Sequence, residues 1–408
     1  MRFSKWKEYI NIFDNIDALL IALVLNVNVL RIILGVSDTN LLLYLMYVLT
    51  VFVIYIKYHK KAVSIIKKMK WVKLTFLFIV AIVFYSMISL LWSNYDSAFM
   101  TFCKFVVALV LAFLCVLEPS DKIKAIGIYF VSLNIFFSIL CLINIDRVTS
   151  MFGDGMNYLN ATLTLGFSFS IALVSLFSAF FNKQIASILF WAILSALFFI
   201  SLLGFIARGV LIFPPLIALC MIPFMGRQQV GKTIIILGIA VCIGFFAFQY
   251  FLDFASDFGA SRMLNLFENP EEQDRVELWQ DCSTIMIDNF WFLFGGGICA
   301  FSSAIYYPHN IFLQILGEYG MIPFIIFIYM LVSLFKKFFR LNKVIKAEYK
   351  WSLFFVIVGM IYYTMTFSKS FSLYDALPLF IMMALMYGYF IDCYLITREN
   401  ETEISRVL

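Results

Sequence analysis

The stretch KKMKWVKLTFLFIVAIVFYSMISLLW, residues 67–92, joins a basic segment to 19 residues without a charged side chain. Because a helix rises about 1.5 Å per residue, an apolar run of this length crosses the roughly 30 Å core of a bilayer. Hydrophobic residues make up 63% of the 408-residue chain and charged residues only 13%, too little charge for a soluble surface. The sequence therefore predicts an all-α polytopic membrane protein, and runs of this length exclude a barrel of short alternating strands.

Twelve apolar segments of comparable length can be laid out along the chain. The first is too long for a signal-peptide core and has no cleavage site behind it, so we expect it to be retained. The predicted spans are residues 16–36, 41–58, 74–92, 98–117, 125–145, 160–181, 185–206, 209–225, 233–252, 311–335, 351–367 and 376–396.

Basic residues fix the expected orientation of these spans. With the N-terminus inside, the cytoplasmic segments hold 23 of the 30 lysine and arginine residues, and the outer segments hold five. Such an excess is the signature of cytoplasmic loops. We therefore expect both termini in the cytoplasm. His59, in the basic loop 57–73, is interpreted as part of a topology anchor beside anionic lipid.

One outer connection is much longer than the others. It follows the ninth span and carries most of the outer acidic groups. This predicts three regions: residues 1–252 with nine spans, an outer loop over 253–310, and residues 311–408 with three spans and a cytoplasmic tail. Because the polar residues are concentrated on the outer face, we expect the chemistry there.

Within the loop, the pattern predicts an amphipathic helix. Asp274 and Glu277 have capping-box spacing, with Arg275 as the first helical residue. The apolar residues Val276, Trp279, Cys282, Met286 and Phe290 then fall close to one face. Such a helix is expected to lie on the membrane surface or against the bundle.

Two further features of the loop suggest no chemistry of their own. The run Gly295–Gly297 lacks the strand that precedes a nucleotide-binding loop, so we interpret it as a flexible turn rather than a phosphate cradle. The eight cysteines of the chain form no CxxC pair. Cys282 and Cys299 both lie in the loop, and we expect free thiols there, although a disulfide stays open.

Basic side chains lie in or close to the outer half of the membrane. Arg208 opens the eighth span, whereas Arg31 and Lys104 lie a few residues below the outer ends of the first and fourth spans. A cation in the bilayer costs a few kcal/mol, so it usually faces a polar cavity or partner. We expect the Arg31 side chain to extend outward to the lipid headgroups. Arg208 has little freedom to do so, because it lies at the junction of two spans. Lys104 could either extend to the headgroups or face a polar cavity or partner.

Cations at headgroup depth suit the diphosphate of a lipid-linked sugar, because a guanidinium donates parallel hydrogen bonds to phosphate oxygens. Attack of a sugar hydroxyl on the anomeric carbon then requires a base. His309 has a suitable pKa, and Pro308 is expected in the first turn of a helix whose N-terminus favours anions.

Glu318 is expected to pair with Lys104 or another cation, or to lie above the hydrocarbon. The outer loops contain no DxD motif or His/Asp cluster, so neither a metal nor another cofactor is predicted, and no nucleic-acid partner.

These elements resemble the bacterial O-antigen ligase and O-antigen or capsule polymerase superfamily. The resemblance rests on the number of spans, the loop before the last three, and residue matches over about 204–210 and 274–323. The matching motifs are the arginine of FIARG (Arg208), DRVELW with Arg275, a glycine-rich turn and PHNIFLQILGEYG with His309 and Asn310.

The resemblance implies a metal-independent glycosyltransferase with a GT-C-like arrangement in the bacterial inner membrane, its active site facing the periplasm. It implies an undecaprenyl-diphosphate-linked oligosaccharide as donor and His309 as the catalytic residue. Arg208 and Arg275 would hold the diphosphate; we add Lys104 to them, with Asn310, Glu318, Lys369 and Arg31 as supporting residues. A chain-length regulator is an expected partner.

Polymerase and ligase differ in the acceptor, which is a lipid-linked repeat unit or lipid A–core. Similar ligases have a second small residue three positions beyond the glycine matching Gly320, and here Pro323 stands there. This departure favours polymerase, with ligase as the alternative. A transporter should show repeated halves and interrupted helices with ionisable groups at mid-membrane, and a lipid-linked oligosaccharide flippase would not need His309 as a base. A scaffold would leave Arg208, Arg275 and His309 without a joint purpose.

Overall fold

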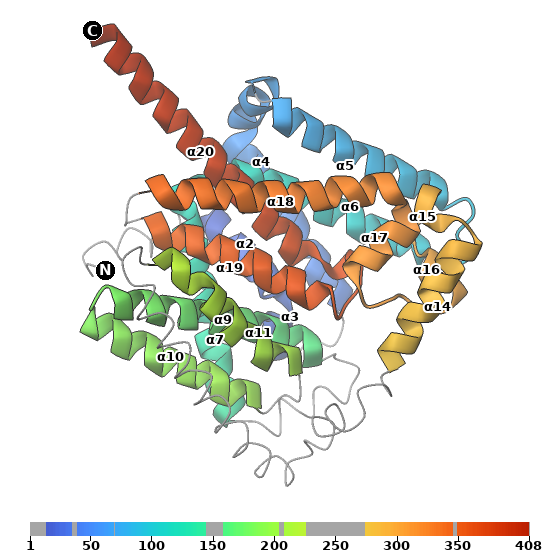
Figure 1. The fold of residues 1–408 in the computed structure, drawn as a ribbon, viewed down its shortest axis with the longest axis horizontal. Helices are drawn as coiled ribbons and strands as arrows, with labels where there is room; N and C mark the ends of the chain where they lie inside the picture. The colour runs from blue at the N-terminus through green and yellow to red at the C-terminus, as the bar shows by residue number, and fades with distance from the viewer. Residues whose placement is uncertain are drawn as a thin grey trace.

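The computed structural model describes residues 14–34, 39–68, 70–143, 158–203, 208–225, 274–345 and 349–407. Regular structure in these ranges is helical throughout, as predicted (Figure 1). The helices are α2 (Ile16–Leu25), α3 (Val27–Leu34), α4 (Thr39–Lys68), α5 (Lys70–Ser89), α6 (Ala98–Leu114), η2 (Cys115–Leu117), α7 (Ser120–Ile143), α9 (Tyr158–Phe181), α10 (Ile185–Leu203), α11 (Arg208–Met225), α14 (Asp274–Asp288), α15 (Trp291–Phe294), α16 (Ala300–Ala304), α17 (Ile311–Tyr319), α18 (Met321–Val344), α19 (Lys350–Phe367), η4 (Leu373–Asp375) and α20 (Leu377–Val407).

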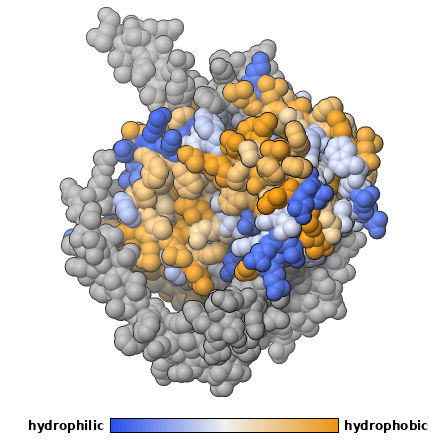
Figure 2. Space-filling model, turned by 45° about the vertical axis from the view of Figure 1, so that its right-hand side comes forward, coloured by the Kyte–Doolittle hydropathy of each residue, from blue (hydrophilic) through white to orange (hydrophobic). Residues whose placement is uncertain are grey.

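Seven of the described helices are long and apolar enough to cross a membrane, or eight if one bent pair forms a single span. The seven segments are Val72–Ser89, Ala98–Leu117, Ser120–Ile143, Ala161–Phe181, Ile185–Leu202, Met321–Val344 and Lys350–Phe367. Apolar side chains also predominate among the described residues on the face that Figure 2 shows, with hydrophilic ones in a few separate groups. The chain is thus a multi-pass helical membrane protein. The predicted span 233–252, and the outer loop before residue 274, lie outside the described residues.

The first predicted span is not one helix. α2 and α3 are bent by 81° at Asn26. The amide of Asn26 donates to the carbonyl of Ala22 at 2.9 Å, and Asn134 of α7 donates to the Asn26 side-chain oxygen at 2.6 Å. These bonds satisfy polar groups at the break, which would otherwise be costly to bury.

The tenth predicted span also differs from the structure. It was predicted to begin at residue 311, but α17 ends at Tyr319 and the membrane-crossing helix α18 begins at Met321. Gly320 between them has φ +88°, and a Cβ there would lie 2.7 Å from the carbonyl oxygen of Leu293. Glycine is the residue that fits such a backbone, so it divides the segment into two helices.

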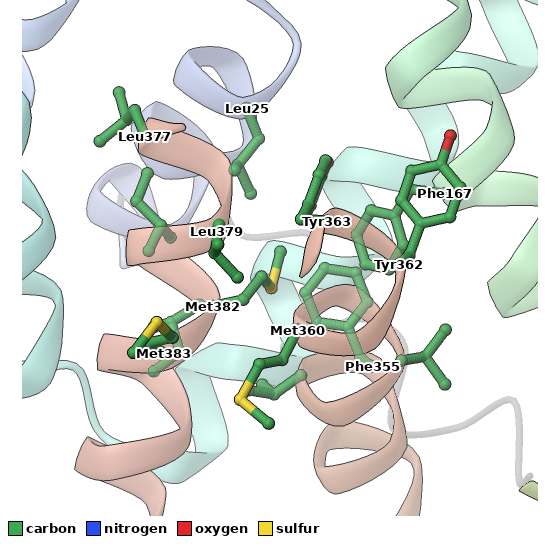
Figure 3. Packing of buried hydrophobic residues seen from close by; sticks show 14 of the residues in the cluster. Leu25, Phe167, Phe355, Met360, Tyr362, Tyr363, Leu377, Leu379, Met382 and Met383 are labelled. Atoms are coloured by element: carbon green, nitrogen blue, oxygen red, sulfur yellow. The ribbon is translucent and has the colours of Figure 1, made fainter. Parts of the chain in front are cut away.

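The centre of the bundle is formed by α19, which contacts α7, α9, α11, α18 and α20. Figure 3 shows its aromatic and methionine side chains between neighbouring helices. Phe167 of α9 lies 5.2 Å, between ring centres, from both Phe355 and Tyr363 of α19. Aromatic rings at such separations pack favourably beyond their simple burial. This packing fixes the position of the loop that follows α19.

At one end of the bundle, several charged residues form ion pairs with one another. The buried carboxylate of Asp17 accepts from Lys57 Nζ at 2.5 Å and from the Tyr58 hydroxyl at 2.6 Å. Lys61 Nζ lies 3.1 Å from Asp392 Oδ1, which joins α4 to α20. These pairs hold together helix ends that are distant in sequence. We refer to this group, Asp17, Lys57, Tyr58, Lys61 and Asp392, as the paired end.

Candidate functional site

The loop helices α14, α15, α16 and α17 gather at one side of the molecule, on the right in Figure 1. The connection between α19 and α20, residues 368–376, lies against α17: the backbone N–H of Leu373 donates to Gln314 at 2.7 Å. Two connections that are separated in sequence therefore form one region. We call it the loop end.

The glycine run fixes α17 in place. The amide of Gly296 donates to the carbonyl of Gly317 at 2.8 Å, and that of Gly297 donates to Glu318 O at 3.0 Å. The run is thus a turn, as predicted, but its backbone is held rather than flexible. Both amides are occupied by protein carbonyls and do not point to a phosphate, which agrees with the second half of the prediction.

The entry to α17 differs from the prediction in register. Pro308 and His309 precede the helix, and Asn310 is its N-cap, with its side chain accepting from the backbone N–H groups of Phe312 and Leu313 at 3.0 and 3.2 Å. An asparagine is among the most favourable N-cap residues, so it defines the start of the helix. The prediction that Pro308 stands in the first turn is wrong. Its carbonyl instead accepts from Trp279 Nε1 at 2.7 Å.

His309 lies half-buried in an aromatic setting. Its ring centre is 4.3 Å from that of Tyr307 and 5.5 Å from that of Tyr306. The buried Nδ1 has no hydrogen-bond partner among the described residues. Burial, and then the positive charge of Arg275, lower the pKa of His309 from 6.5 to about 4. The imidazole is therefore neutral at pH 7. In the free protein it is also a weaker base than its ordinary pKa would make it, so the suitable pKa expected from the sequence is not found here.

Arg275, in the first turn of α14, faces the same region. One of its guanidinium nitrogens donates to the carbonyl oxygen of Lys369 at 2.8 Å and lies 3.3 Å from the Ser370 hydroxyl. These acceptors are neutral, and no carboxylate within the described ranges forms an ion pair with Arg275. Among the described residues, the partners of its guanidinium are therefore a carbonyl and a hydroxyl.

The helix α11 connects two further predicted site residues, because it begins with Arg208 and contacts the side chain of Lys369. Lys369 Nζ lies 5.9 Å from the ring centre of Phe213. Arg208 begins α11, five residues before Phe213, and its side chain is outside the described part of the structure. The structure thus brings Arg275 close to His309 and to the backbone of Lys369. The Lys369 ammonium contacts α11, the helix that begins with Arg208.

Lys104 and Glu318 do not pair with each other. Lys104 forms its ion pair with Asp375, in the connection 368–376. Glu318 is fully buried, and its carboxylate accepts from the Tyr374 hydroxyl at 2.5 Å and from Gln314 Nε2 at 3.2 Å. α17 is not among the candidate spans. Burial raises the pKa of Glu318 to about 8, with the two hydrogen bonds opposing the shift. Glu318 is thus a protonated structural group rather than a cation partner.

Arg31 lies elsewhere. It is in α3 and only 8% exposed, with one nitrogen 3.5 Å from Asn28 Oδ1. The expectation that it extends outward to the headgroups is therefore wrong. α3 contacts α4, α7 and α9, which are not the helices that carry His309 and Arg275.

The loop helix α14 is present where predicted, beginning at Asp274. Cys282 and Met286 are buried against Phe301, as the predicted face requires, but Val276 and Phe290 are 40% and 61% exposed. The helix packs on α15–α17 through a narrower stripe than predicted. Cys282 and Cys299 are free thiols, as expected.

Several residues of the loop end were not anticipated. They are Tyr306, Tyr307, Trp279, Ser370, Asp375 and Tyr374. The sequence SKSFSLYDA over 368–376, a polar segment between two apolar runs, was the available signal. Only Lys369 of this segment could be selected from the sequence, because the partners of the other residues are far away along the chain.

The described residues contain no group of three His, Cys, Asp or Glu side chains placed to hold a metal ion. Metal independence stays a prediction. In comparisons with known proteins, no family model matches this chain, and no curated protein matches it. The likeness to O-antigen polymerases and ligases therefore rests on the predicted span pattern and the short motifs of the sequence.

Proposed function

We propose that this chain is a membrane-embedded glycosyltransferase that moves a glycan from a polyprenyl diphosphate to a sugar hydroxyl at the loop end. The observation that carries the proposal is the meeting of His309 and Arg275. A neutral, half-buried imidazole with an unbonded buried nitrogen lies in the field of a guanidinium whose described partners are neutral. This arrangement offers a base and positive charge in one place.

The reaction follows from these two groups. The acceptor hydroxyl oxygen forms a bond to the anomeric carbon, and the bond from that carbon to the diphosphate oxygen breaks. The hydroxyl proton goes to the imidazole of His309, and the diphosphate leaves with the bonding electron pair. Arg275, with Arg208 and Lys369, stabilises the charge that develops on the leaving group.

Substrate binding would improve the base. In the free protein the charge of Arg275 contributes to the low pKa of His309. An anionic diphosphate beside Arg275 offsets that charge, so the pKa of His309 rises on binding. The imidazole becomes a stronger base only when the leaving group is in place.

The polymerase assignment is the finer part of the proposal. Its support is the sequence resemblance, with Pro323 in place of the small residue of similar ligases. It carries with it an undecaprenyl-linked donor and repeat-unit acceptor, the bacterial inner membrane with a periplasmic site, and a chain-length regulator as partner.

Twelve spans with both termini cytoplasmic belong to the proposal as well. Residues assigned to the cytoplasmic side, such as Asp17, Lys57 and Asp392, meet at the paired end. Residues assigned to the outer side meet at the loop end, where Trp92 Nε1 donates to Gly296 O at 3.0 Å. This segregation is the pattern expected of alternating spans.

The glycans of a deletion strain test the proposal. We expect a single repeat unit on lipid A–core, because a polymerase supplies the later repeats; long lipid-linked polymer that never reaches the core would instead identify a ligase. Wild-type protein should restore long chains. The variants Arg208→Ala, Arg275→Ala and His309→Ala should be present in the membrane at normal levels without restoring them. Normal polymer with His309→Ala would eliminate the base assignment.

One observation favours transport as a second candidate function. The helix pair α2–α3 is interrupted at Asn26, and the buried Asn134 bonds to the break, as in transporters with discontinuous helices. A flippase would move lipid-linked oligosaccharide across proteoliposome membranes without lengthening it. If Asn26→Leu abolished such movement and His309→Ala left it intact, transport would replace transfer.

A further inference from the structure

An apolar groove runs between α5, α6, α18 and α20. Its main part has a volume of about 150 Å³, and a hollow of about 60 Å³ adjoins it towards α17. Phe78, Ile79, Leu109, Phe327 and Phe380 line both parts. The two hollows are therefore one continuous groove, whose lining is apolar except for a few side chains at one end.

The groove follows one face of α18. Pro323, Phe327, Met330, Leu334 and Lys337 line it at steps of three or four residues, which is the spacing of a helix face. At about 1.5 Å per residue, the 14 residues from Pro323 to Lys337 cover about 21 Å. The groove thus extends over most of a bilayer core, from beneath the loop end to the opposite side.

A cation closes the far end of the groove. Lys337 Nζ donates to Ser333 Oγ at 2.8 Å and lies 5.3 Å from the ring centres of Tyr387 and Phe390. No carboxylate forms an ion pair with it in the ranges that the structure describes. A lysine inside an apolar helix usually faces a polar partner, and here the neighbours supply only a hydroxyl and aromatic faces.

The surroundings of Lys337 add to this charge. Lys336, Arg340 and Lys343 lie within six residues of it on the same helix end, and all three are exposed. Basic residues beside a groove between membrane helices on the cytoplasmic side suit an anionic lipid headgroup. Lys337 stands on the side that the basic residues assign to the cytoplasm.

We propose that this groove binds an anionic phospholipid of the leaflet on the Lys337 side, with its phosphate at Lys337 and an acyl chain between α5, α6, α18 and α20. The position of the cation decides between this lipid and the glycan carrier. A carrier whose diphosphate lies at Arg275 has its charge at the loop end, and would leave Lys337 facing hydrocarbon alone. The choice between these two lipids rests on the proposed function, whereas the groove and the cation at its end do not.

Native mass spectrometry of the full-length protein in detergent tests the proposal. Phosphatidylglycerol and phosphatidylcholine with identical acyl chains are titrated separately. Because a lysine near a lipid surface contributes about 1 kcal/mol, phosphatidylglycerol should bind about fivefold more tightly. Equal affinity of the two lipids would overturn the proposal without any variant.

Variants locate the two parts of the lipid. Lys337→Met should remove the preference for phosphatidylglycerol, whereas Lys343→Met, a matched loss of charge at an exposed position, should keep it. Ala384→Phe fills the groove and leaves Lys337 in place, so it should weaken binding of both lipids. Each variant is used only if it elutes as a single species with wild-type helix content.

Two results contradict the proposal. An unchanged preference in Lys337→Met would mean that the phosphate lies elsewhere, and undiminished binding by Ala384→Phe would mean that the chain lies elsewhere. Undecaprenyl phosphate serves as the competing probe. If it displaced phosphatidylglycerol and its own binding were lost in Lys337→Met, the groove would belong to the carrier lipid instead.

Discussion

The paired end and the loop end both contain charged side chains, but they use them differently. At the paired end Asp17 is buried and receives hydrogen bonds from Lys57 and Tyr58, so charge is met by charge. At the loop end Lys104 is paired with Asp375, but Arg275 donates to a backbone carbonyl and a hydroxyl, and the Nδ1 of His309 has no partner in the described residues. Cancelled charge holds helices together, whereas uncancelled charge and an unused nitrogen are available to a ligand.

The largest expected effect separates the two histidines of the chain. His309→Ala should slow glycan transfer by purified protein about 10²- to 10⁴-fold, the range for loss of a general base. His59→Ala is the matched control, because His59 is exposed on α4, where its contacts are the Ile56 carbonyl at 3.0 Å and the Tyr55 ring. The rate of glycan transfer from a lipid-linked donor is measured for both variants. Equal rates for the two variants would remove the functional distinction between the ends.

The next effect concerns stability at the paired end. Asp17→Asn removes the carboxylate that Lys57 and Tyr58 share, and we expect a loss of about 2 kcal/mol, reduced from that of a fully buried pair because Lys57 is partly exposed. Asp121→Asn replaces an exposed acid at the same end, and it should change the free energy of unfolding little. Thermal unfolding in detergent compares them. A neutral Asp17→Asn would show that the pair is not structural.

A smaller effect is expected at Glu318. Its folded pKa of about 8 lies above the ordinary 4.5, so the folded state binds more protons between these values and stability falls as pH rises through this range. Glu318→Gln mimics the protonated form and should abolish the dependence, while changing stability by about 1 kcal/mol at pH 6. Unfolding midpoints from pH 5 to 9 test this. If the unfolding midpoint of Glu318→Gln still fell as pH rose, the pH dependence would belong to another group.

The smallest effect is the titration of His309 itself. Its NMR midpoint should lie near pH 4, and Arg275→Gln should raise it, because the guanidinium contributes to the low pKa. Stability should fall as pH drops from 6.5 towards 4, since the unfolded chain then binds the extra proton. His59→Gln assigns the two signals, and Lys57→Gln should leave the midpoint unchanged. A midpoint near 6.5 would refute the burial of His309.

Much of the helical architecture could be predicted from the sequence, because span length and apolar composition are local properties. The breaks could not. Asn26 interrupts the first span because Asn134, more than a hundred residues later, bonds to it, and Gly320 divides the tenth span because Leu293 approaches its backbone. Both causes are contacts between distant segments, which periodicity within one segment does not contain.

The candidate site likewise contains residues that could be selected from the sequence and contacts that could not. His309 and Arg275 could be selected from residue type, position in the loop and motif. The acceptors of Arg275 in the connection 368–376, the ion pair of Lys104 with Asp375 and the burial of Arg31 depend on how helices meet. Residue type suggests a chemistry, whereas the partners of each side chain depend on packing.

The backbone at His309 restricts which residues can replace it. Its φ of +52° is unfavourable for most side chains, least so for glycine, asparagine, aspartate and histidine. A valine or isoleucine there would distort the chain beside the N-cap of α17 as well as remove the imidazole. A library at this codon should therefore recover few folded proteins outside that small set. Among them, asparagine removes the basic imidazole while it still tolerates the backbone conformation, so it tests the loss of the base without distortion of the chain.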